Sequence, residues 1–136
     1  MNKLLLLDDN HFVVMSFKGI LDSKYILLVA RNYDEALKLY SEEPDIEVII
    51  SDVNLQDYRT GLDFVNLVRM NNPYVQIIFC SGENNYDYVK DHCCRYLPKP
   101  VMPDVLLESI EKALQYREQL VRKNKQLFHN LENATA

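Results

Sequence analysis

The sequence predicts an α/β fold in which one parallel sheet is covered by helices on both faces, and three observations support this prediction. Five short apolar runs of strand length recur along the 136 residues. Most of these runs are apolar at consecutive positions, which is typical of strands buried on both sides of a parallel sheet. The segments between them read as helices, and strands that alternate with helices form such a sheet through right-handed crossovers.

The expected strands can be placed in chain order. The apolar runs lie at residues 4–7, 25–29, 46–51, 75–80 and 95–97, and the last run is the weakest. For five strands we expect a flavodoxin-like, doubly wound five-stranded parallel sheet in the order 2-1-3-4-5. In this order the carboxyl ends of the first and third strands meet at the switch point, where ligands bind in open α/β sheets.

Two of the intervening helices have clear limits in the sequence. Asn32, with Glu35 three residues later, is expected to cap a helix over residues 33–42. A second helix is expected over residues 61–70. Its apolar face should comprise Leu62, Val65, Leu67, Val68 and Met70. Each helix therefore has an apolar side with which to cover the sheet.

A single long helix is expected from Pro103 onward, and it should extend beyond the sheet that it covers. We therefore assign residues 1–115 to the domain that contains the sheet and residues 116–136 to a C-terminal helical extension. The extension would act as a coiled coil or as a linker to an output domain. The alternative is a helix that simply covers the sheet and then frays.

The long helix carries the repeat of a coiled coil. Steps of three and four residues connect Leu107, Ile110, Leu114, Arg117, Val121, Asn124, Phe128 and Leu131. The polar Arg117 and Asn124 would weaken such a seam, yet they could define its register. We therefore predict a homodimer through this helix, with Leu114, Val121 and Phe128 in the seam.

Composition limits the classes of function. The formal net charge is −5, whereas nonspecific binding to nucleic acid requires a surplus of Lys and Arg, so we expect no direct nucleic-acid contact. No apolar run approaches the roughly 20 residues that a bilayer requires, so we expect no membrane insertion and a cytoplasmic protein. Cys80, Cys93 and Cys94 are expected to be reduced and to have no function beyond packing.

Acidic residues follow two of the expected strands. Asp8 and Asp9 end the first strand, and Asp52 ends the third. The predicted strand order would bring three carboxylates to one edge of the sheet. Clustered carboxylates repel one another unless a cation neutralises them, and hard oxygen ligands favour Mg²⁺, with Mn²⁺ as a substitute. The sequence therefore predicts a magnesium site at this edge.

Two further strand ends provide groups that bind a phosphoryl group. Ser81 follows the fourth strand, and Lys99 follows the fifth. A hydroxyl can hydrogen-bond a phosphoryl oxygen, and an ammonium can neutralise its charge. Asp52 would be the nucleophile, as in aspartyl-phosphate chemistry. Each residue alone has an ordinary explanation as a turn, cap or surface residue, but their combination favours phosphoryl transfer to Asp52.

Four segments resemble the response-regulator receiver family. They read LLLLDDN, IISDVNL, FCSG and YLPKP, and the resemblance covers residues 3–113. It implies two-component signal transduction, in which a sensor histidine kinase or a histidine phosphotransfer protein supplies a phosphoryl group to Asp52. It implies that Ser81 and Lys99 contact this group. The metal ligands that it implies are Asp8, Asp9, Asp52 and the backbone carbonyl of Asn54.

The resemblance also implies roles in switching and dephosphorylation. Tyr96 resembles the aromatic residue that repositions when the hydroxyl residue, here Ser81, is drawn toward the phosphate. Asn54 and Glu83 resemble the pair that helps to orient the hydrolytic water in chemotaxis regulators, which implies self-dephosphorylation. The bond before Pro100 is implied to be a cis peptide bond.

Departures from the family pattern leave other functions open. The segment 81–99 is several residues shorter than is usual, so we expect a brief or irregular fourth helix. This short segment, with an altered loop after Asp52, supports a receiver-like interaction module that is not phosphorylated. A haloacid-dehalogenase-like phosphatase would use Asp8 as nucleophile with an acid two residues on, where this chain has Asn10. We expect a phosphoacceptor signalling domain that catalyses only its own phosphotransfer and dephosphorylation.

Overall fold

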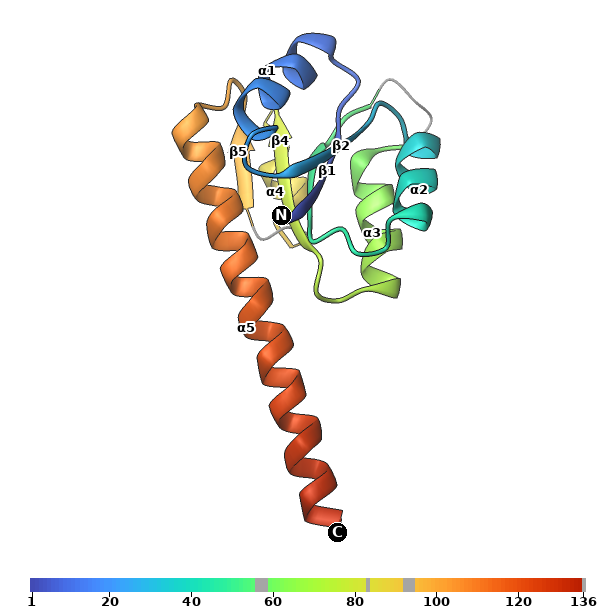
Figure 1. The fold of residues 1–136 in the computed structure, drawn as a ribbon. Coiled ribbons are helices and arrows are strands. Elements are labelled where there is room, and N and C mark those ends of the chain that lie inside the picture. The colour runs from blue at the N-terminus through green and yellow to red at the C-terminus, as the bar shows by residue number, and fades with distance from the viewer. Residues whose placement is uncertain (56–58, 83, 92–94, 136) are drawn as a thin grey trace.

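A computed structural model of the chain describes residues 1–55, 59–82, 84–91 and 95–135. Five parallel strands form one sheet in the order β2-β1-β3-β4-β5, which confirms the predicted order (Figure 1). The strands are β1 (Lys3–Leu7), β2 (Ile26–Ala30), β3 (Val48–Asp52), β4 (Gln76–Ser81) and β5 (Arg95–Pro98). The apolar runs therefore located all five strands to within two residues at each end.

Helices connect the strands and cover both faces of the sheet (Figure 1). They are α1 (His11–Leu21), α2 (Tyr33–Glu42), α3 (Gly61–Asn71), α4 (Tyr86–Val89) and α5 (Pro103–Thr135). The predicted limits of α2 are confirmed, with Asn32 as its cap. The expectation of a brief fourth helix is also confirmed, because α4 has four residues.

Alternate residues of β1 contribute to two separate cores. Leu5 and Leu7 pack with residues of α2 and α3, whereas Leu4 and Leu6 pack with residues of α1 and α5. All four side chains are buried. Full burial of a leucine side chain contributes roughly 1.5–3 kcal/mol, which explains why this strand is apolar at all four positions after Lys3.

The buried face of α3 differs in part from the predicted face. Leu62, Val65 and Val68 are buried as expected, but Met70 is 83% exposed. Phe64, which the prediction omitted, is fully buried. Successive helical residues are separated by about 100°, so residues 64, 65 and 68 share one side of the helix and residue 70 lies away from it.

The predicted long C-terminal helix is confirmed, and α5 extends far beyond the sheet (Figure 1). Its contacts with the rest of the domain continue past the expected boundary at residue 115. An ion pair joins Arg117 to Glu47 at 3.6 Å, and the Asn124 amide donates a hydrogen bond to the Tyr74 hydroxyl. No helix in the described ranges is long and apolar enough to cross a membrane.

Candidate functional site

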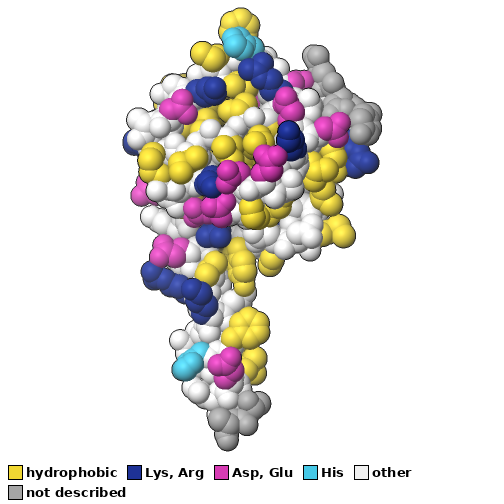
Figure 2. Space-filling model, turned by 45° about the vertical axis from the view of Figure 1, so that its right-hand side comes forward, with side chains coloured by type: hydrophobic (Ala, Val, Ile, Leu, Met, Phe, Trp, Pro, Cys, Tyr) yellow, Lys and Arg dark blue, Asp and Glu magenta, His cyan; other side chains and the backbone are white. Residues whose placement is uncertain are grey.

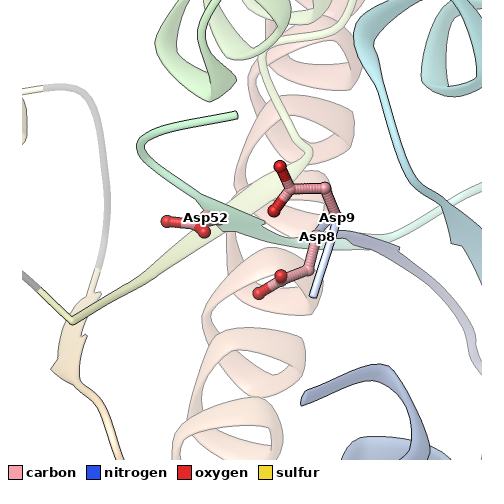
Figure 3. A group of neighbouring side chains, drawn as sticks. All are labelled: Asp8, Asp9 and Asp52. Carbon is pink, nitrogen blue, oxygen red and sulfur yellow. The ribbon is translucent and has the colours of Figure 1, made fainter. Parts of the chain in front are cut away.

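Three carboxylates lie together at the carboxyl ends of β1 and β3 (Figure 3). The register pairs Leu7 with Ser51, so Asp8 and Asp52, the residues that follow them in the chain, lie side by side. One carboxylate oxygen each from Asp8, Asp9 and Asp52 lies within 4.8 Å of the other two. The strand order therefore brings together acids that are more than 40 residues apart in the sequence.

Lys99 lies against two of these carboxylates. Its Nζ is 2.7 Å from Asp8 Oδ2 and 3.2 Å from Asp52 Oδ2. The Lys99 backbone N–H also donates to the Ser81 carbonyl oxygen at 2.8 Å, which extends the pairing of β5 with β4 to this residue. The bond between Lys99 and Pro100 is a cis peptide bond, as the resemblance implied.

Burial and charge together set the ionisation of the site. Burial raises the pKa of the Asp52 carboxyl above its usual range, and the Asp8 carboxylate adds to this effect, while Lys99 opposes it. Burial lowers the pKa of the Lys99 ammonium, but the carboxylates of Asp8 and Asp52 raise it by more. Lys99 therefore stays charged and partly neutralises the acidic cluster.

The donor atoms of the cluster suit a hard divalent cation. Mg²⁺ prefers carboxylate and carbonyl oxygens, and Asp8, Asp9 and Asp52 provide three carboxylates. Cys80 is buried nearby, but burial raises the pKa of its thiol to about 12, so it offers no thiolate near neutral pH. The residues present therefore fit Mg²⁺ better than a metal that requires sulfur ligands.

Asn54 lies close to the proposed acceptor. Its backbone N–H donates to Asp52 Oδ1 at 3.2 Å, which places the start of this loop beside the carboxylate. The use of its carbonyl oxygen as a metal ligand stays a prediction. Glu83, the other residue expected to tune dephosphorylation, lies outside the described residues, as do Cys93 and Cys94.

Ser81 and Tyr96 are connected through a residue that the sequence did not single out. Ser81 is buried at the end of β4, and its Oγ accepts a hydrogen bond from the Asn85 amide at 2.9 Å. The Tyr96 hydroxyl accepts a hydrogen bond from the Asn85 backbone N–H at 3.1 Å. A polar residue four positions after Ser81 was the available signal, but four-residue spacing alone does not predict this contact.

Gly61 is a second residue that sequence reasoning missed. A Cβ atom at this position would overlap the Asp52 carbonyl oxygen and would lie 2.5 Å from Ser51 Oγ. Its φ angle is not positive, so space and not backbone conformation requires glycine here. The first turn of α3 therefore packs directly on the backbone of Asp52.

The fold and this site together define a class of protein. The family described as the response regulator receiver domain matches residues 4–111. The chain therefore belongs to the response regulator receiver family of two-component signalling. The matched range contains all five strands except Lys3 of β1, together with the cluster of carboxylates and Lys99.

One curated protein matches nearly the whole chain. The chain is 29% identical over 145 residues to the uncharacterized transcriptional regulatory protein YesN of Bacillus subtilis (strain 168). The match covers 98% of this chain but 39% of that protein, so the chain spans less than half of the relative's length.

Solved structures show the same fold. A response regulator receiver domain protein from Clostridium thermocellum is similar with a TM-score of 0.81 and 25% identity, covering 88% of this chain and 99% of that chain. The chemotaxis protein CheY4 of Vibrio cholerae is similar with a TM-score of 0.76 and 30% identity. The match covers 84% of this chain and 99% of that chain.

Proposed function

We propose that Asp52 accepts a phosphoryl group in a Mg²⁺-dependent reaction from a sensor histidine kinase or a histidine phosphotransfer protein. The arrangement of three carboxylates with Lys99 carries this proposal, because Lys99 Nζ contacts both Asp8 and Asp52. When all four groups are ionised, three negative charges and one positive charge leave −2 at the site. This charge suits a divalent cation.

The proposed transfer uses each residue in a defined role. A carboxylate oxygen of Asp52 attacks the phosphorus of a phosphohistidine, an O–P bond forms as the N–P bond breaks, and the imidazole leaves with the bonding electrons and takes up a proton. Lys99 would pair with the phosphoryl oxygens, and the Ser81 hydroxyl would donate to one of them. Mg²⁺, held by Asp8, Asp9, Asp52 and the Asn54 carbonyl, would neutralise charge on the transferring group.

Hydrolysis would return the protein to its resting state. Asn54 and Glu83 are the residues that we propose to tune the lifetime of the phosphorylated form. Ser81 and Tyr96 would change position with the state of Asp52 and so alter the surface that a partner recognises. In this proposal the chain catalyses only its own phosphorylation and dephosphorylation and has no other substrate.

The structure gives Asn10 a role that disfavours the phosphatase alternative. Its side chain accepts hydrogen bonds from the N–H groups of Phe12 and Val13 at 2.9 and 3.1 Å, so it caps α1. The phosphatase would require an acid at this position to protonate a leaving group. A neutral capping residue cannot supply that proton.

The proposed setting of the domain is a two-component system in the cytoplasm. We propose that α5 acts as a coiled coil that pairs two copies of the chain or as a linker to an output domain. The similarity to a transcriptional regulatory protein, of which the chain spans less than half, supports a role for α5 as a connection.

Mass spectrometry with a small phosphodonor tests the acceptor function. With acetyl phosphate and Mg²⁺, or with Mn²⁺ in its place, the intact chain should gain one phosphoryl group. Asp52→Asn should gain none, because an amide is not a nucleophile at phosphorus. Asp22→Asn is the matched control, since Asp22 is an exposed carboxylate at the end of α1, and it should behave as wild type.

Two results would contradict the acceptor function. Phosphorylation of Asp52→Asn to the wild-type extent would move the acceptor to another residue. A wild-type chain that binds Mg²⁺ but gains no phosphoryl group from acetyl phosphate or from a phosphohistidine protein would favour the interaction module that is not phosphorylated. Chelation of divalent cations should abolish the gain in the wild-type chain.

A further inference from the structure

Asn85 lies between the two residues that would respond to a phosphoryl group. Its side-chain amide donates to Ser81 Oγ at 2.9 Å, and its backbone N–H donates to the Tyr96 hydroxyl at 3.1 Å. Both distances are ordinary for N–H···O hydrogen bonds, and both bonds are partly buried. One residue therefore connects the end of β4 to the tyrosine on β5.

The side chain of Asn85 does not cap the helix that it precedes. Asn85 is the N-cap of α4, yet it makes no side-chain capping hydrogen bond. The N-cap residues of α1, α2 and α3 all accept such bonds, and these residues are Asn10, Asn32 and Thr60. A capping side chain stabilises a helix because it accepts a hydrogen bond from a backbone N–H group that has no partner within the helix. The Asn85 amide thus bonds Ser81 while α4 is left without a side-chain cap.

Contacts through Asn85 reach the whole of α4. Its backbone carbonyl accepts hydrogen bonds from Tyr88 N–H at 3.1 Å and Val89 N–H at 3.2 Å. The ring of Tyr86, the first residue of α4, lies edge-on to the Tyr96 ring with centroids 5.7 Å apart. A displacement of Asn85 would therefore shift both α4 and Tyr96.

We propose that Asn85 is a positioning residue that couples the Ser81 hydroxyl to Tyr96 and α4. This inference rests on the proposed phosphorylation of Asp52. When Ser81 turns to donate to a phosphoryl oxygen, its bond to the Asn85 amide breaks, and Asn85 releases Tyr96 and the first turn of α4 from their present positions. Without this link, Ser81 would still bind the phosphoryl group, but Tyr96 would respond less.

Nuclear magnetic resonance of a chain labelled on its tyrosine rings tests the coupling. Beryllofluoride with Mg²⁺ serves as the probe, because it mimics a phosphoryl group on a carboxylate. The Tyr96 signal is the one that disappears in Tyr96→Phe. In the wild-type chain this signal should shift as beryllofluoride saturates the site.

The variant Asn85→Ala removes the amide but keeps the backbone N–H that contacts Tyr96. It should still be saturated by beryllofluoride, with an affinity changed by about twofold to tenfold, as expected for one hydrogen bond. At saturation its Tyr96 shift should be less than half of the wild-type shift. Asn85→Leu should give the same loss, because leucine keeps the approximate size of the side chain but has no polar atom that could hydrogen-bond Ser81.

Asn84→Ala is the matched control, since Asn84 is the preceding residue of the same type and is exposed. It should retain the full Tyr96 shift. A full shift in both Asn85 variants at saturating beryllofluoride would overturn the coupling and leave the acceptor function intact. Failure of the wild-type chain to bind beryllofluoride would overturn both.

Discussion

Lys99 shows how much of the site depends on a single side chain. Its ammonium lies 2.7 Å from Asp8 and 3.2 Å from Asp52, and its side chain is 18% exposed. Asp8 is 1% exposed, so its charge is removed from water and depends on this partner. Removal of Lys99 would leave buried carboxylates without a counter-charge, whereas a divalent cation could replace part of its effect.

Asp52→Asn should raise the free energy of unfolding at neutral pH when no divalent cation is present. Burial and the Asp8 carboxylate hold the pKa of Asp52 above its unfolded value of about 3.9, although Lys99 opposes them, so the ionised carboxylate costs stability above the folded-state pKa. This cost is lost as the pH falls through the folded-state pKa. The difference in the free energy of unfolding between the variant and the wild-type chain should therefore shrink with falling pH and vanish below about pH 3.9.

Urea denaturation at several pH values measures this difference. Mg²⁺ should make the wild-type chain the more stable of the two, because it binds the folded wild-type chain more tightly than the folded variant. A ligand at 100 times its Kd adds about 2.7 kcal/mol to the free energy of unfolding. Equal stability of the two proteins at neutral pH without Mg²⁺ would show that burial does not disfavour the ionised Asp52 carboxylate.

At the scale of elements, the connection from β3 to α3 positions the acceptor. Thr60 and Asp63 form a capping box at the start of α3, with hydrogen bonds of 2.8 and 3.2 Å. The Gly61 N–H donates to the Val53 carbonyl oxygen at 3.1 Å, and Ser51 Oγ donates to the Asp52 carbonyl oxygen at 2.8 Å. The end of the strand and the start of the helix are thus held together around the acceptor.

Gly61→Ala should destabilise the domain by roughly 1–3 kcal/mol, as overpacking of a filled site does. The new Cβ would overlap the Asp52 carbonyl oxygen, so the backbone of the acceptor must move, and phosphorylation by acetyl phosphate should slow. Chemical denaturation and the rate of phosphorylation are the two measurements.

Gly19→Ala is the matched control for this prediction. Gly19 lies within α1, and a Cβ there would meet nothing within 4 Å. Alanine in a helix interior is favoured over glycine by roughly 0.5–1 kcal/mol, so this variant should be more stable than wild type and should be phosphorylated at the wild-type rate. Equal effects of the two substitutions would show that the space around Gly61 does not matter.

At the scale of the whole molecule, α5 projects beyond the domain and exposes large apolar side chains near its end. Leu114 packs against the core, and Val121 is half-buried, so the proximal part of the expected seam faces the domain itself. Arg117 and Asn124 also contact the domain through Glu47 and Tyr74, where the sequence suggested that they define the register of a dimer. The distal part remains exposed, as Figure 2 shows. Its large apolar side chains are Leu127, Phe128 and Leu131.

A homodimer through this distal segment predicts concentration-dependent association in analytical ultracentrifugation. Phe128 is 64% exposed. Phe128→Glu should raise the Kd of the dimer at least tenfold, because it places a charge in an apolar seam. Gln126→Glu adds the same charge at a neighbouring exposed position and should associate as wild type. A wild-type chain that is monomeric at high concentration, with Asp52 phosphorylated or not, would rule out the dimer.

The sequence by itself determined the sheet, its strand order and the acidic site. Strands of a parallel sheet are apolar at consecutive positions because both faces are buried, and this signal is local. Asp8 and Lys99 follow the ends of strands, Asp52 is the last residue of one, and parallel strands present those ends at one edge. The strand order alone therefore predicts that these three residues lie close together, without knowledge of side-chain positions.

Only the tertiary structure decided which side chains meet between elements. The burial of Phe64 and exposure of Met70 depend on the rotation of α3 over the sheet. The bond from Asn85 to Ser81 and the contact of Asn124 with Tyr74 depend on the direction of single side chains. Such contacts join positions with no fixed spacing in the sequence, because the packing of the whole domain sets the distance between their atoms.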